Sequence, residues 1–196
     1  MQGPAHWWGL SLPERVRGRM STEFERSIKS SILKVVAAHW LAVRGGRDMP
    51  AWASLMPSAL KLQLPYVWSY AYHSASDSFT GRLAGDRVSA IFGDNFHGLP
   101  MSEAQPTQNY PSLFAKCKRV ITEPGLYSGS GITFNHAGNL YGGERIIMPL
   151  QNVETGGLTV FGAIDFSGRF PKEPQKINFD AEIENWFGTN GEKVTG

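Results

Sequence analysis

Positions three and four residues apart form an apolar stripe in the first well-patterned segment of the chain. Thr22 and Glu25 match the capping box, in which both side chains satisfy backbone N–H groups at the start of a helix. The stripe that follows consists of Phe24, Ile28, Ile32, Val35, Val36, His39 and Val43. Gly45 and Gly46 can adopt the left-handed conformation that ends a helix. The pattern therefore predicts one long amphipathic helix over residues 22–43.

Alternating apolar and polar positions then predict strands. The aromatic residues of segment 66–72 alternate with smaller ones, and a second run over 79–84 follows a polar turn, which is typical of a hairpin. Short helices are expected next, one capped by Asp86 and one opening at Tyr110. Three further strand-like runs cover residues 126–134, 144–150 and 158–166.

The order of these elements predicts the fold class. A helix, two strands, short helices and three strands indicate an α+β domain with one five-stranded antiparallel sheet and its helices on one face. A final short helix is predicted from the spacing of Phe179, Ile183, Trp186 and Phe187. The expected organisation is a flexible arm over 1–20, the amphipathic helix over 21–46, the domain over 47–166 and a tail over 167–196.

Composition and charge exclude several classes of protein. A chain of 196 residues with 41% hydrophobic and 18% charged residues is ordinary for one globular domain with extensions. The net charge of +2 comes without a basic stripe, so we expect no nucleic-acid partner. The most apolar stretch, Ile32–Val43, is interrupted by Lys34 and is too short to cross a bilayer, so no membrane anchor is expected. One cysteine and no leader pattern predict a cytoplasmic protein.

Four short stretches carry a resemblance to a known family. They are Trp40 with Arg44-Gly45-Gly46-Arg47-Asp48-Met49-Pro50, Gly81-Arg82-Leu83-Ala84-Gly85-Asp86-Arg87-Val88, Phe92-Gly93-Asp94 with Gly98, and Ile147-Met148-Pro149-Leu150. With them the chain resembles the PAS fold, and more narrowly a bacterial group of compact PAS-like proteins with a long helix before the domain. The resemblance implies a five-stranded sheet cupping a small cavity under helices. It also implies a ligand or cofactor in that cavity, whose identity differs between family members.

Two residues are candidates for holding a cofactor. His97 follows the first mid-chain helix and could ligate a haem iron, but haem-binding PAS domains resemble one another in a histidine on the next helix, which has none here. Cys117 could be a flavin-reactive thiol, but the flavin motif that follows such a cysteine is missing, and a buried structural thiol is the better interpretation. The cofactor therefore stays unknown. His39 is interpreted as a core or interface histidine.

Other residues are candidates for lining the cavity. Arg82 and Arg145 could anchor a carboxylate by a bidentate pair, with a solvent-facing position on the sheet as the alternative. The small residues of 128–131 predict a close backbone approach or room for a ligand. The expected cavity wall consists of Phe92, Phe114, Met148 and Phe161, for which plain core packing is the alternative.

Three functions follow from this resemblance. The first is a sensory domain that binds a small molecule and signals through association with an unknown signalling protein. The apolar stripe of the N-terminal helix predicts a homodimer, and the aromatic row of 66–72 predicts that an added helix or subunit covers part of it. The second is a ligand-free adaptor module. The third, an enzyme with His97 as base and Arg82 as anchor, has no catalytic motif in its support, so we expect no enzyme.

Overall fold

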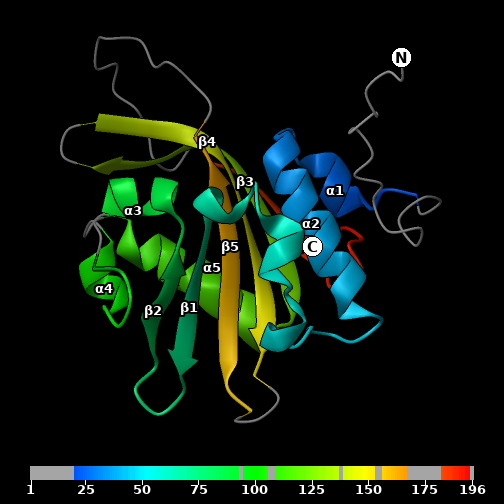
Figure 1. The fold of residues 1–196 in the computed structure, drawn as a ribbon, viewed down its shortest axis with the longest axis horizontal. Helices are drawn as coiled ribbons and strands as arrows, with labels where there is room; N and C mark the ends of the chain where they lie inside the picture. Colours follow the sequence, from blue (N-terminus) through cyan, green and yellow to red (C-terminus); the bar gives the residue numbers. More distant parts are fainter. Residues whose placement is uncertain are drawn as a thin grey trace, which may run out of the picture.

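The computed structural model describes residues 20–92, 95–105, 109–136, 139–152, 156–166 and 182–194. It contains a six-stranded antiparallel sheet in the order β2-β1-β5-β4-β3-β6, with helices on both faces (Figure 1). The α+β class with one antiparallel sheet is confirmed. The sheet has one strand more than predicted, and the helices do not keep to one face.

The elements follow the predicted order along the chain. The helices are α1 (Glu23–Ser27), α2 (Ser31–Arg44), α3 (Asp86–Phe92), α4 (Met101–Ala104) and α5 (Tyr110–Thr122). The 3-10 helices η2 (Trp52–Ser54), η3 (Pro57–Leu60) and η4 (Leu64–Tyr66) lead into the sheet. The strands are β1 (Val67–His73), β2 (Ser78–Ala84), β3 (Gly125–His136), β4 (Asn139–Gln151), β5 (Leu158–Asp165) and β6 (Ile183–Gly188).

The predicted long N-terminal helix is two helices. The capping box is present, because the Glu25 amide donates to Thr22 Oγ1 at 3.2 Å and the Thr22 amide donates to Glu25 Oε2 at 2.8 Å. The helix nevertheless ends at Ser27, and the chain is extended at Ile28 and at Ser30, which caps α2. The Lys29 and Ser30 amides donate instead to the carboxylate of Glu144 on β4. A partner from a distant strand therefore replaces helical hydrogen bonds at this break.

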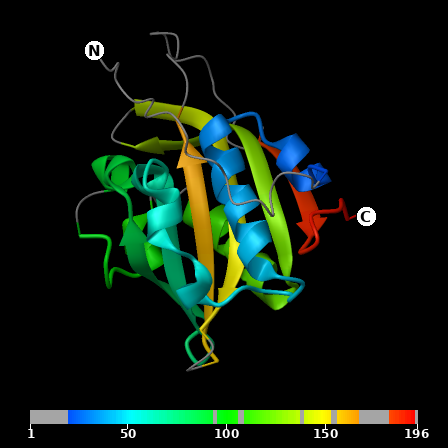
Figure 2. The same cartoon turned by 45° about the vertical axis from the view of Figure 1, so that its right-hand side comes forward.

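Helix α2 lies across one face of the sheet (Figure 2). Its buried residues Leu33, Val36 and Trp40 pack with side chains of β4 and β5, and the Trp40 indole donates to the Pro149 carbonyl at 2.9 Å. Gly45 ends the helix in the left-handed conformation, as predicted. Of the α2 residues in the predicted stripe, only Val36 is buried against the sheet, whereas Ile32, His39 and Val43 are half-buried and Val35 is 39% exposed. The homodimer through this helix therefore stays a prediction.

The other face of the sheet is covered by α3, α4 and α5 (Figures 1 and 2). Trp68 and Tyr70 on β1 are 5% and 1% exposed, so the chain's own helices bury the middle of the aromatic row, whereas Tyr66 and Tyr72 are half-buried. A Cβ on Gly162 would lie 2.2 Å from the Trp68 ring, so only glycine leaves room for this indole. The interior under the helices is packed with aromatic side chains.

The segment predicted as a final helix is strand β6. It pairs with β3 in the antiparallel register that begins at Ser130 and Ile183. Trp186 packs on the α5 face and Phe187 on the α2 face, which is the two-residue period of a strand. Phe179, which helped to predict the helix, lies outside the described residues. In so short a segment, helical and strand spacing are hard to tell apart.

Candidate functional site

A buried ion pair lies on the α5 face of the sheet. Arg145 projects from β4, and its Nε donates to Oε1 of Glu182 at 2.7 Å while Nη2 donates to Oε2. The two side chains are 10% and 6% exposed, so water screens this pair very little. The planar guanidinium matches a carboxylate in this two-bond geometry. Arg145 thus makes its bidentate pair with a carboxylate of its own chain, whereas the predicted partner was the carboxylate of a ligand.

Lys116 on α5 brings a second cation to the same carboxylate. Its Nζ lies 3.7 Å from Glu182 Oε2 and 2.8 Å from Glu184 Oε1, and it donates to Ser112 Oγ at 2.6 Å. The Lys116 side chain is 10% exposed, whereas that of Glu184 is 38% exposed. Glu182 is therefore the inner carboxylate of this cluster and Glu184 the outer one.

Tyr127 on β3 completes the cluster. Its hydroxyl is fully buried and makes no hydrogen bond of good geometry within the described part of the chain. A Cβ on Gly129 would lie 2.1 Å from Glu182 Oε1 and 2.6 Å from the Tyr127 hydroxyl, which places both groups over this glycine. Burial raises the pKa of Tyr127, with the nearby Glu182 adding to the effect of burial. The room predicted at 128–131 is therefore filled by Glu182.

The charge of Arg145 depends on its carboxylate. Burial alone would lower the pKa of Arg145, but attraction to Glu182 more than offsets burial and holds the pKa above its ordinary value. An isolated buried cation would be costly. The buried positive charge of Arg145 is thus neutralised only when a carboxylate pairs with it.

Cys117 lies next to this cluster in the apolar core. The thiol is completely buried, and burial raises its pKa to about 12 against the opposing effects of Arg145 and Lys116. A thiol with this pKa is neutral at physiological pH. The structural interpretation of Cys117 is therefore favoured over a reactive one.

The predicted ligand-binding residues do not gather at one cavity. Phe114 packs on the α5 face with Phe79, at 5.5 Å between ring centroids, and Cys117 lies on that face too. Met148 and Phe161 instead pack on the α2 face, because their strands turn these positions toward α2. Those two do not line a cavity under α3–α5.

The remaining predicted residues are also scattered. Arg82 is half-buried and stacks over Trp52, at 4.7 Å, and Trp52 packs with the α2 face. His97 is exposed, as the surface-loop alternative proposed. The side chain of Phe92 lies outside the described side chains. Arg82 and His97 thus do not converge on one substrate.

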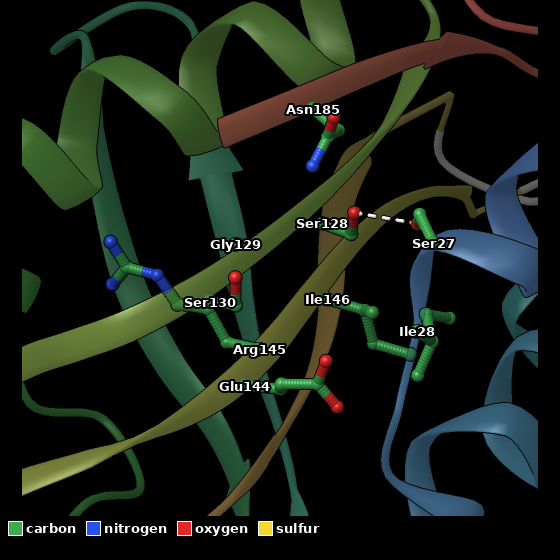
Figure 3. Close-up of a pocket in the computed structure, with 9 residues that line it drawn as sticks. All are labelled: Ser27, Ile28, Ser128, Gly129, Ser130, Glu144, Arg145, Ile146 and Asn185. Atoms are coloured by element: carbon green, nitrogen blue, oxygen red, sulfur yellow. Dashed lines mark hydrogen bonds between the residues drawn. The ribbon is translucent and has the colours of Figure 1, made fainter. Parts of the chain in front are cut away.

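A small polar hollow lies on the opposite face, next to α1 (Figure 3). Its volume is about 10 Å³, which suits a single water molecule. Ser27 and Ser128 share a hydrogen bond of 2.8 Å at its wall. Glu144 and Arg145 leave β4 in opposite directions, so the guanidinium points away from this hollow (Figure 3). The hollow is too small for an organic ligand.

A comparison with models of protein families shows to which family the chain belongs. The model of a PAS domain matches residues 28–165, which is more than half of the sequence. The chain belongs to the PAS domain family. Arg145, Lys116 and Tyr127 lie inside the matched PAS domain, whereas Glu182 lies beyond its end. No curated protein and no solved structure gives a significant match.

Neither a membrane-spanning helix nor a metal-binding cluster occurs in the described part of this PAS domain. None of the described helices is long and apolar enough to span a membrane. Within the same ranges, histidine, cysteine and acidic residues do not gather in groups of three that could hold a metal ion.

Sequence reasoning missed three members of the cluster, which are Lys116, Tyr127 and Glu182. Arg145 was weighed as a carboxylate anchor, but its partner lies in a segment where we predicted a helix. The alternation of Glu182, Glu184 and Trp186 on one side of a strand was the signal that could have revealed the partner.

Proposed function

We propose that this PAS domain is a sensory module that binds a small molecule on the α5 face of its sheet. In this proposal the bound state is passed on through association with a signalling protein in the cytoplasm. The family supports a sensory or signalling role. The observation that carries the ligand is the buried cluster of Arg145, Lys116 and Tyr127 inside the PAS domain.

A contribution to the stability of the fold is by itself a weak explanation for this buried cluster of charged and polar side chains. Replacing a buried ion pair by well-packed apolar residues is often neutral or stabilising, because desolvation offsets the attraction between the charges. Groups with strongly shifted pKa values gather preferentially at functional sites. Tyr127 and Arg145 both have shifted pKa values and both face the core under α5. These facts favour a binding role for this face.

The first experiment is native mass spectrometry of the freshly purified protein together with an absorbance scan. We expect a discrete bound mass in the wild type, and we expect Arg145→Gln to lose it. Arg82→Gln is the matched control, because Arg82 lies on the same sheet but stacks over Trp52 on the α2 side. Loss of the bound mass in Arg82→Gln and its retention in Arg145→Gln would contradict the proposed position.

The same spectrum reports the number of subunits. A dimer would support the predicted homodimer, for which the exposed part of the α2 stripe, including Val35, is available. A monomer at tens of micromolar would contradict the homodimer and leave association with a different protein as the output.

The second candidate function is a ligand-free adaptor. The observation in its favour is the filled interior under α3–α5, where Trp68, Tyr70 and Phe96 are each at most 5% exposed and pack together. A protein that purifies without any bound mass, and in which Arg145→Gln leaves partner binding intact, would favour the adaptor over the sensor.

A further inference from the structure

Glu182 supplies the buried carboxylate that pairs with Arg145 and Lys116. Arg145, Lys116 and Tyr127 belong to the residues matched by the PAS family, but the carboxylate that joins them comes from a segment beyond the match. The domain proper therefore builds a buried cationic site on β4 and α5, and the C-terminal segment fills it.

The geometry of the site requires a carboxylate, not this particular residue. The Arg145 fork recognises two oxygens in one plane, and any carboxylate presents them. Gly129 leaves the space above β3 that these oxygens and the Tyr127 hydroxyl occupy. Beyond its carboxylate, the Glu182 side chain adds only two methylene groups, which corresponds to propionate.

Glu182 lies at the end of the paired part of the sheet. The register between β3 and β6 begins at Ile183, one residue after Glu182. Strand β6 remains anchored by Trp186, whose ring lies 4.9 Å from that of Tyr127 and 4.1 Å from the Arg119 guanidinium carbon. Displacing Glu182 costs its bonds to Arg145 and Lys116, while the paired residues Ile183–Gly188 of β6 lie beyond it in the chain.

We infer that Arg145, Lys116 and Tyr127 form a binding site for the carboxylate of a small molecule, and that Glu182 occupies this site when the ligand is absent. The inference deepens the proposed sensory function and rests on it. Entry of the ligand expels Glu182 and frees the start of β6. The C-terminal segment is then the part of the protein that reports occupancy.

The test removes the internal carboxylate and supplies an external one. Full-length wild type, Glu182→Ala and the control Glu123→Ala are titrated with sodium propionate and, separately, with neutral propionamide at constant ionic strength. Glu123 is a suitable control because its side chain is 73% exposed and pairs with Arg119 at the end of α5. Binding is followed by the indole N–H resonance of Trp186, which packs on Tyr127.

We expect Glu182→Ala to bind propionate roughly tenfold to a hundredfold more tightly than the wild type, because the competing charged hydrogen bonds are gone. Propionamide should not bind, and adding Arg145→Gln to Glu182→Ala should abolish propionate binding. Equal propionate affinity in the wild type and Glu182→Ala, or binding that survives Arg145→Gln, would overturn the inference.

The inference can also be tested if Glu182→Ala fails to fold. If this variant is unfolded because Arg145 is left unpaired, propionate and not propionamide should restore its thermal transition. No recovery with propionate would overturn the inference.

The failure of this inference differs from the failure of the proposed function. If native mass spectrometry identifies a bound small molecule that has no carboxylate, the inference is contradicted and the sensory function is still supported. A second outcome separates the two in the opposite direction. If propionate binds at Arg145, but the protein purifies without a ligand and its partner binding does not change with propionate, the carboxylate site is supported and the sensory function is contradicted.

Discussion

The buried pair of Arg145 and Glu182 should show a much larger coupling energy than an exposed pair in the same protein. The perturbation is a double-mutant cycle of Arg145→Gln, Glu182→Gln and both together. The comparison is the same cycle on Arg119 and Glu123, which also form an ion pair. Glutamine keeps the approximate size of Glu182 and removes the charge.

The magnitude follows from exposure and geometry. The buried side chains are 10% and 6% exposed and share two charge-assisted hydrogen bonds, so removing one partner should cost about 3–5 kcal/mol. The double variant leaves no unpaired charge on this pair, and the coupling energy should therefore be about 2–3 kcal/mol. The exposed pair, at 48% and 73% exposure in an (i, i+4) arrangement, should couple by only about 0.3–0.5 kcal/mol.

The assay is urea unfolding of all seven proteins, followed by tryptophan fluorescence and circular dichroism. The free energy of unfolding is compared only between variants that share the wild-type slope with urea. A coupling energy for Arg145 and Glu182 no larger than that of the exposed pair would refute the reasoning. In that case the Glu182 carboxylate would not be the group that offsets the desolvation cost of burying Arg145.

Three further predictions concern the core. Cys117, with a pKa near 12, should react with a thiol reagent only after unfolding, and rapid labelling of the native protein would contradict its burial. Burial lowers the pKa of His39 in the folded protein, so the unfolded chain binds a proton at this histidine at a higher pH than the folded protein does. The free energy of unfolding should therefore fall as the pH drops below 6.5. The variant His39→Phe should show a weaker pH dependence when denaturant unfolding is compared. Gly162→Ala should destabilise the protein by about 1–3 kcal/mol because its Cβ would overlap the Trp68 ring, and a stabilised variant in thermal melts would show that the indole can move.

Local patterns predicted the features that depend on neighbouring residues. The capping box of Thr22 and Glu25, the left-handed end of α2 at Gly45 and the hairpin of β1 and β2 are all present. Each is decided within a few residues: the capping box by side chains that satisfy nearby amides, the end of α2 by a glycine with positive φ, and the hairpin by a short turn that ends at Asp77 with φ 46°. The PAS family also followed from short stretches of sequence, and the family match confirms it.

The errors lie where a partner comes from far along the chain. The helix break at residues 28–30 depends on Glu144, and no local pattern indicates that this carboxylate takes the two amides. Met148 and Phe161 follow the alternative of plain core packing, because their strands turn them toward α2 and not toward α3–α5. A strand's alternation tells which residues share a face, but only the packing of α2 and α5 decides which face is which.

The candidate site shows the same division. By itself the sequence determined that Arg145 is available to pair with a carboxylate and that Gly129 leaves space on its strand. Only the tertiary structure decided that the carboxylate is Glu182, because β6 had to add to the edge of the sheet beside β3 before that side chain could reach Arg145. Burial of an ion pair is a property of the whole packed core, since every neighbour that excludes water contributes to it.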